Sequence, residues 1–277
     1  MKISIDKKKN KIKKIEDKEN KVNWLAPEVR FLDNCLLINN KILVLGDLHI
    51  GFEEHIIEKG IFPRIQLKDI FERLKNIFKL LKEEKVILDK IIILGDLKHE
   101  FGGISDTEWK EVMELLSYLN KKCKDIILIK GNHDNILGPI AKKSNVKLKN
   151  YYKIKKKINK KDCEICFAHG HKNFKGCESS DILIIGHLHP AITLSDNYKK
   201  EKYKCFLKGR WKGKLVYVLP SFSLVSFGFD LRSIRSLEKS KGFLIINSKK
   251  LEGFEVIVYN NKDKKYHNFG KLKKFVE

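Results

Sequence analysis

Five apolar stretches of this 277-residue sequence end in glycine, histidine or aspartate, and they carry seven of the nine histidines. The stretches are KILVLGDLH (41–49), IIILGDLKHE (91–100), IILIKGNHD (126–134), ICFAHGH (165–171) and ILIIGHLH (182–189). Short β-branched runs closed by glycine predict buried strands. Polar residues just past the carboxyl ends of strands are where α/β proteins build their sites. Histidines and carboxylates gathered there indicate a site for divalent metal ions.

The polar ends of these stretches offer ligands for two cations. Asp47 and His49 can reach one ion, because residues two apart on an extended chain lie on the same side. Asp96 follows a second strand, and a carboxylate with two oxygens can bridge two cations. An amide oxygen and three imidazoles complete the set: Asn132, His169, His187 and His189. A single Gly-Asp turn or a single histidine carries little weight, so the prediction depends on the combination.

The charge of this ligand set suits the hydrolysis of a phosphate ester. Two divalent ions bring +4 and the carboxylates of Asp47 and Asp96 return −2, and the remaining +2 favours a phosphate ester and acidifies a bridging water. Ions roughly 3.5–4 Å apart can hold both the attacking and the leaving oxygen of an in-line displacement. His133 neighbours Asn132 and is expected to point away from the ligands. Asp134 is expected to orient the His133 ring and favour its protonated form, which makes His133 the general acid for the departing oxygen.

The series GDLH, GDLKHE, GNHD, HGH and GHLH resembles the calcineurin-like metallophosphoesterases over residues 29–228. The resemblance implies an α/β fold, a four-layer α/β/β/α sandwich. It also implies two metal sites, the first formed by Asp47, His49, Asp96 and His189 and the second by Asp96, Asn132, His169 and His187, with His133 as the proton donor oriented by Asp134. Within HGH, His171 is an alternative ligand to His169, which the motif match favours. Mixed oxygen and nitrogen ligands fit two divalent ions, with Mn²⁺ expected and Fe²⁺, Zn²⁺, Co²⁺ and Ni²⁺ as alternatives.

The second motif departs from the pattern of the phosphoprotein phosphatases in this superfamily. They usually read GDxxDR, whereas this chain reads GDLKHE, with His99 and Glu100 at the last two positions. The arginine that would clamp a phosphomonoester is absent there, which favours a phosphodiester in nucleic acid or nucleotides as the substrate. A phosphomonoesterase is the alternative enzyme. The same fold can also serve as a non-catalytic scaffold or as a nucleic-acid-binding module, although every expected ligand is present.

A finer resemblance is to the ligase-associated DNA-damage-response endonucleases and their archaeal relatives. The stretches GDLHIGFEEH, IFPRIQ, FLKGRW and VLPSFSLVSFG are similar to the pattern of that subgroup. The resemblance implies that Glu53, His55 and Arg64 line the substrate groove. The alternative is that Glu53 and His55 are ordinary polar residues at the start of a helix.

Helical and strand patterns alternate along the chain as far as His189, and strands dominate the remainder. A strand is expected over residues 29–38, and an amphipathic helix over 66–84. A second helix over 105–123 begins with Ser105 and Glu108, spaced as in a capping box. Further strands are expected over 203–208, 215–219, 242–247 and 253–259. These patterns predict two packed sheets with helices outside them, in a single domain over 23–277 that follows a lysine-rich, weakly ordered extension over 1–22.

The net charge of +23 favours polyanionic partners, because each phosphate that is neutralised releases counterions. Lysine-rich segments over 141–161 and 199–214 either contact nucleic acid or form a solvated face. The N-terminus is too polar for a signal peptide and no apolar run is long enough to span a bilayer, so a cytoplasmic protein without membrane contact is expected. The six cysteines are expected to be free thiols. No protein partner is indicated.

Overall fold

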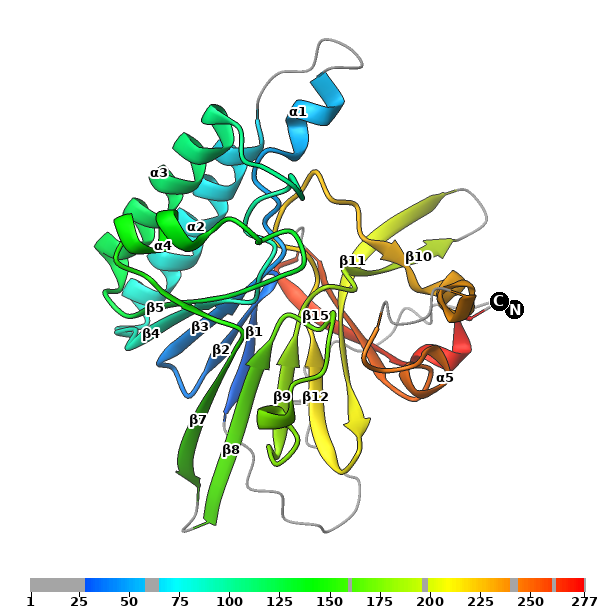
Figure 1. Cartoon of the computed structure of the whole chain (residues 1–277). Coiled ribbons are helices and arrows are strands. Elements are labelled where there is room, and N and C mark those ends of the chain that lie inside the picture. Colours follow the sequence, from blue (N-terminus) through cyan, green and yellow to red (C-terminus); the bar gives the residue numbers. More distant parts are fainter. Residues whose placement is uncertain are drawn as a thin grey trace.

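The computed structural model describes residues 28–57, 65–158, 161–195, 199–239, 244–260 and 263–276, and it packs two β-sheets against each other (Figure 1). Buried side chains from both sheets meet between them, among them Val44 and Ile127 from the first sheet and Phe167 and Phe206 from the second. Helices pack on the outer face of each sheet. The predicted four-layer sandwich is therefore confirmed. The extension predicted over residues 1–22 lies outside the described residues.

The first sheet has six strands in the order β1-β2-β3-β4-β5-β6, and β3 to β6 run parallel. The strands are β1 (Val29–Leu32), β2 (Cys35–Ile38), β3 (Ile42–Leu45), β4 (Lys90–Ile93), β5 (Ile126–Ile129) and β6 (Lys147–Lys149). The single strand predicted over 29–38 is a hairpin instead. The chain turns at Asp33, whose φ of 54° lies in the left-handed region that aspartate tolerates better than most residues.

The helices of the first half are α1 (Phe52–Ile57), α2 (Gln66–Glu83), α3 (Asp106–Lys122) and α4 (Gly138–Lys143). The last three cover the outer face of the first sheet (Figure 1), and α2 buries Ile70, Leu74 and Ile77 against it. Both helices predicted from periodicity are confirmed. Ser105 caps α3, because its Oγ accepts a hydrogen bond from the backbone N of Glu108 at 3.0 Å. No helix within the described ranges is long and apolar enough to cross a membrane.

The second sheet contains nine strands, with the central path β13-β10-β11-β12-β9-β8-β7; β14 pairs with β11, and β15 pairs with β14. The strands are β7 (Tyr151–Ile158), β8 (Lys161–Ala168), β9 (Ile182–Ile185), β10 (Pro190–Ser195), β11 (Lys200–Trp211), β12 (Lys214–Val218), β13 (Phe229–Asp230), β14 (Glu255–Asn260) and β15 (Lys265–Lys271). Here β8, β9 and β12 run parallel. The carboxyl ends of β8 and β9 therefore point the same way.

Short helices form the outer layer of the second sheet. They are η1 (Lys175–Cys177), η2 (Leu231–Lys239), α5 (Ser248–Leu251) and η3 (Leu272–Lys274). Leu231, Leu251 and Leu272 from these helices are buried in the cluster on that face. The strand predicted over 242–247 is wrong for its described part, residues 244–247, because Asn247 caps α5 by accepting a hydrogen bond from the backbone N of Lys250 at 2.9 Å.

Two cysteines of the second sheet region correct the prediction of free thiols. Cys166 on β8 and Cys177 in η1 form a disulfide, with their Cα atoms 5.6 Å apart. The chain returns after β8 over the outer face of the sheet, where both side chains lie in the same buried cluster. Cys163, three residues before Cys166, faces the core between the sheets instead, because side chains alternate along a strand.

Candidate metal centre

The loops after β3, β4, β5, β8 and β9 bring the predicted ligands to one place. They form two groups that share Asp96, and within each group the potential ligand atoms lie within 4.8 Å of one another. The first group is Asp47, His49, Asp96 and His189, and the second is Asp96, His169 and His187. A single carboxylate common to both groups is the geometry that a bridging ligand requires.

The first group converges on the Nε2 atoms of two histidines. Nε2 of His49 lies 3.1 Å from Nε2 of His189 and 3.6 Å from Oδ2 of Asp96. Nε2 of His189 also lies 3.3 Å from Oδ1 of Asp47. Asp47 is fully buried and Asp96 is 2% exposed. Buried charges are costly unless they are paired or bind a metal, so this arrangement favours a cation.

The second group surrounds Nε2 of His169. This atom lies 3.1 Å from Nδ1 of His187, 3.0 Å from Oδ1 of Asn132 and 3.3 Å from Oδ2 of Asp96. The opposite ring nitrogen, Nδ1, donates a hydrogen bond to the carbonyl oxygen of Leu94 at 2.7 Å. Such a bond turns Nε2 toward the site, as is common for histidines that bind metals. Asn132 thus lies with the group to which the resemblance assigns it.

Electrostatics favour a charged state of both carboxylates. Burial raises the pKa of Asp47, but His189 outweighs burial and holds it below its ordinary value. Burial also raises the pKa of Asp96, and His169 outweighs it in the same way. Burial, assisted by His189, lowers the pKa of His49 to about 3, so this imidazole is neutral at neutral pH. Burial lowers the pKa of His169, but Asp96 and Asp47 outweigh it and raise it to about 9, so a cation bound there must displace a proton.

The ligand loops are held in an uncommon backbone conformation. Five candidate ligands have φ in the left-handed region: Asp47 (55°), His49 (47°), Asp96 (47°), His187 (68°) and His189 (48°). Such conformations cost of order 1–3 kcal/mol each and gather at functional sites. The extended geometry expected for Asp47 and His49 is wrong, because β3 already ends at Leu45. A hydrogen bond from the backbone N of His49 to the carbonyl oxygen of Asp96, 2.9 Å long, joins the two loops instead.

Glycines in the sequence motifs allow the loops to approach each other. A Cβ at Gly131 would lie 2.0 Å from Oδ1 of Asp96, and a Cβ at Gly186 would lie 2.4 Å from Oδ2 of Asp47. The glycine of GNHD therefore makes room for one candidate carboxylate, and the glycine of GHLH makes room for the other.

The predicted general acid, His133, lies beside the first group. Its Nε2 is 3.8 Å from Oδ2 of Asp96, and its Nδ1 donates a hydrogen bond to the carbonyl oxygen of His99. The group that orients His133 is therefore this carbonyl.

The carboxylate of Asp134, which the sequence predicts to orient His133, accepts hydrogen bonds from backbone N–H groups instead. Its two carboxylate oxygens accept hydrogen bonds from the backbone N atoms of Leu97, at 3.1 Å, and Gly131, at 2.9 Å. Burial raises its pKa to about 7. The structure thus corrects the expected role, because Asp134 ties the loops after β4 and β5 together. Adjacent residues in an irregular loop can point in different directions, which the sequence alone does not reveal.

His171 lies next to the second group without contributing to it. Its ring centroid is 5.2 Å from that of His169, and it is His169 whose nitrogen belongs to the group. Burial, together with His169, lowers the pKa of His171 to about 4. This geometry agrees with the choice of His169 over His171.

Glu53 has a structural role that the sequence left open. Its Oε1 accepts hydrogen bonds from the backbone N atoms of Ile65, at 3.0 Å, and Gln66, at 2.8 Å, where α2 begins. This placement supports the alternative of an ordinary polar residue for Glu53. The side chain of His55 and all of Arg64 lie outside the described residues.

The loop of Asp47 and His49 rests on residues for which the sequence suggested no role. Oγ of Ser221 donates to the carbonyl oxygen of Asp47 at 2.9 Å. Nε2 of Gln66 donates to the carbonyl oxygen of His49 at 2.8 Å and to Oγ of Ser223 at 2.9 Å. Ser221 and Ser223 are fully buried within the apolar segment VLPSFSLVSFG. In the sequence, the presence of these serines inside an apolar segment could have indicated that they are buried and hydrogen-bonded.

Several lysines of the two lysine-rich segments have partners within the fold. Lys155 on β7 lies opposite Glu164 on β8 in the strand register, and the hairpin of these two strands extends away from the loops after β3 and β4 (Figure 1). Lys153 forms an ion pair with Glu164 at 2.6 Å. In the second segment, Nζ of Lys204 donates to the carbonyl oxygen of Ser221 at 2.9 Å, which makes this lysine part of the framework behind the site.

Comparison with known proteins supplies the context for this geometry. The family model of the calcineurin-like phosphoesterases matches residues 40–230. No protein of curated function matches the sequence. Among solved structures, the nuclease MPE of Pseudomonas putida is similar at 17% identity and a TM-score of 0.51, over 82% of this chain and 90% of that one. The E. coli phosphoesterase Yfce is similar at 13% identity and a TM-score of 0.38, over 83% of this chain and 98% of that one.

Proposed function

The chain belongs to the calcineurin-like phosphoesterases, and we propose that this metal-dependent hydrolase is a phosphodiesterase that uses two divalent cations to cleave nucleic acid or nucleotides. The observation that carries the proposal is the position of Asp96. Its Oδ2 lies 3.6 Å from Nε2 of His49 and 3.3 Å from Nε2 of His169, so one carboxylate serves both groups.

The donor set fits two divalent ions. It combines two buried carboxylates, one amide oxygen and four imidazoles: Asp47, Asp96, Asn132, His49, His169, His187 and His189. Oxygen and nitrogen donors without thiolate suit Mn²⁺ or Fe²⁺, and we propose Mn²⁺. When bound, such ions polarise a phosphate ester and acidify a water.

His133 is the residue proposed to protonate the leaving oxygen. Its Nδ1 is fixed on the carbonyl oxygen of His99, and its Nε2 faces the site beside Asp96. The ring of Phe101 packs against the His133 ring, with centroids 3.5 Å apart. A histidine held in this way can deliver a proton to a departing alkoxide, which typically contributes a factor of about 10²–10⁴ in rate.

Exposed apolar side chains around the centre favour a substrate with flat apolar groups. Phe101 is 54% exposed and lies against His133, and Phe227 is 78% exposed beside Ser226, whose Oγ is 3.1 Å from Nδ1 of His189. Ile136 in the loop after β5 and Leu224 in the loop after β12 are also exposed. Exposed apolar clusters mark binding surfaces, and aromatic side chains stack on nucleobases. A nucleotide or nucleic acid diester matches this surface better than a small phosphomonoester does.

The proposal is tested by hydrolysis assays of the purified chain with Mn²⁺. We expect faster turnover of bis-(p-nitrophenyl) phosphate than of p-nitrophenyl phosphate, and cleavage of an oligonucleotide. Phe227→Ala should raise KM for the oligonucleotide and leave hydrolysis of methyl p-nitrophenyl phosphate unchanged. Phe269→Ala, which removes an exposed phenylalanine of β15, is the matched control. Preference for the monoester, with no cleavage of the oligonucleotide, would contradict the proposal.

A further inference from the structure

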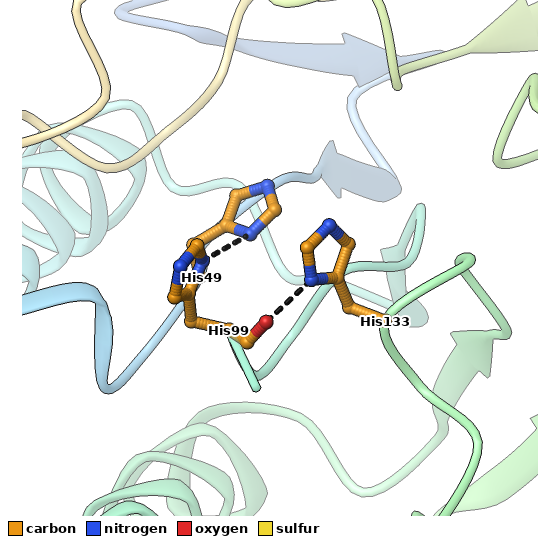
Figure 2. A group of neighbouring side chains, drawn as sticks. All are labelled: His49, His99 and His133. Atoms are coloured by element: carbon orange, nitrogen blue, oxygen red, sulfur yellow. Dashed lines mark hydrogen bonds between the residues drawn. The ribbon is translucent and has the colours of Figure 1, made fainter. Parts of the chain in front are cut away.

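His99 lies against two residues of the proposed site at once (Figure 2). Its Nδ1 is 3.4 Å from Nδ1 of His49, and its carbonyl oxygen accepts the hydrogen bond from Nδ1 of His133. We propose that His99 is a positioning residue that fixes the ring orientation and the tautomer of His49 and, through its backbone, the ring orientation of His133. This inference rests on the proposed function, because it assumes that Nε2 of His49 binds a cation.

His99 itself is firmly anchored, as a positioning residue must be. Its backbone N donates to Oε1 of Glu108 at 2.7 Å and to the carbonyl oxygen of Ile50 at 2.9 Å. The carboxylate of Glu108, which is 1% exposed, also accepts from the backbone N of Glu100 at 3.1 Å. The ring of Phe52 meets the His99 ring edge-on with centroids 4.7 Å apart. Backbone and ring are therefore both held before any cation binds.

The contact between the two Nδ1 atoms determines where the proton of His49 lies. Two ring nitrogens form a hydrogen bond only if one carries a hydrogen and the other presents a lone pair. Nε2 of His49 faces Asp96 and His189 and must present its lone pair to a cation. The hydrogen of His49 is then on Nδ1 and is donated to Nδ1 of His99, which carries its own hydrogen on Nε2. A partner of this kind typically changes metal affinity by about 10–100-fold.

The contact to His133 uses the backbone of His99. A carbonyl oxygen only accepts, so Nδ1 of His133 carries a hydrogen and Nε2 is the nitrogen left facing Asp96. The two rings stack with centroids 5.4 Å apart and an interplanar angle of 25°. A side-chain substitution at His99 therefore removes the acceptor for His49 but keeps the acceptor for His133.

Substitutions of His99 by asparagine and by leucine distinguish the effect of the hydrogen-bond acceptor from the effect of side-chain shape. The Oδ1 of asparagine can occupy the place of Nδ1 and accept from His49, whereas leucine has the same branching without an acceptor. We expect His99→Leu to weaken Mn²⁺ binding by about 10–100-fold and His99→Asn to bind close to wild type. The measurement is a titration of metal-free protein with Mn²⁺, followed by the electron paramagnetic resonance signal of free Mn²⁺. Thermal unfolding of both variants checks that they are folded.

The outcomes separate this inference from the proposed function. If wild type binds two Mn²⁺ and both variants bind them as tightly, His99 has no positioning role. If both variants are equally weakened, the ring of His99 acts by packing and the tautomer argument fails. Wild-type protein that binds fewer than two Mn²⁺ contradicts the proposed function itself. Activity at saturating Mn²⁺ should recover in His99→Leu, because the backbone carbonyl that accepts from Nδ1 of His133 is kept.

Discussion

Gly131 is the point at which the candidate centre leaves least room for an added methyl group, and Gly131→Ala should therefore disable it. A Cβ there would lie 2.0 Å from Oδ1 and 2.4 Å from the backbone N of Asp96. Non-bonded atoms prefer separations of roughly 3.5 Å, so the loop after β5 and Asp96 must move apart by more than about 1 Å. A displacement of about 1 Å at reacting groups can cost on the order of 10²-fold in rate. We expect at least this loss in Gly131→Ala, together with a lower metal content.

The assay for this variant combines rate, metal content and stability. Hydrolysis of bis-(p-nitrophenyl) phosphate is measured with Mn²⁺, bound metal by elemental analysis, and unfolding by the thermal midpoint. Overpacking should also cost about 1–3 kcal/mol of stability, so the comparison is made well below the midpoint. Gly102→Ala and Gly138→Ala are matched controls, because a Cβ at either position meets nothing within 4 Å. A Gly131→Ala variant as active as these controls would refute the close packing of the loop against Asp96.

Four further outcomes follow from the same geometry. Asp96→Asn should lose activity and bound metal in elemental analysis, because a neutral amide would face both proposed cations; retention of two ions would contradict the proposed bridging role. His133→Ala should keep its metal and lose about 10²–10⁴-fold in turnover, with a smaller defect for nitrophenolate than for poor leaving groups; equal defects would exclude a general acid. A chelator should lower the thermal midpoint of wild type, because the ions bind only the folded state; an unchanged midpoint on calorimetry would contradict this linkage. Burial raises the pKa of Asp230, but hydrogen bonds from Arg232 and Thr193 outweigh burial and lower this pKa to about 2. The carboxylate of Asp230 therefore stabilises the fold above about pH 4, and this stabilisation is lost as the pH falls toward 2. Asp230→Asn should therefore lower the midpoint at pH 7 and flatten its dependence between pH 4 and 2.

The individual strands that precede the candidate ligands, and the helix over 66–84, could be predicted from the sequence. An apolar run closed by glycine and a polar residue specifies a buried strand and the residue at its end, and β3, β4, β5, β8 and β9 all obey this rule. The periodicity over 66–84 likewise specifies α2, because its apolar residues recur on one helical face. Parallel neighbours then bring their ends together without further information. This is why the ligand types, their order and the two-sheet fold could be expected.

The contacts of single side chains could not be predicted in the same way. Glu108 has the spacing of a capping box, yet its Oε1 accepts from the backbone N of His99, in the loop after β4. Asp134 is adjacent to His133 but bonds the backbones of Leu97 and Gly131. The local sequence pattern allows each of these carboxylates more than one hydrogen-bond partner. The partner that is chosen depends on which distant segment, or which turn of the loop, lies beside the carboxylate. The left-handed conformation of the ligand loops is another consequence of tertiary contacts.

The centre depends on both sheets, and this dependence connects the core to the site. Asp47, Asp96 and Asn132 follow strands of the first sheet, whereas His169, His187 and His189 follow strands of the second. The spacing between these two sets is determined by the side chains packed between the sheets, such as Phe167 and Ile92. Because interiors are close-packed, a change of volume there shifts one set of ligands against the other. Metal affinity is therefore a sensitive measure of packing between the sheets, even for substitutions that contact no ligand.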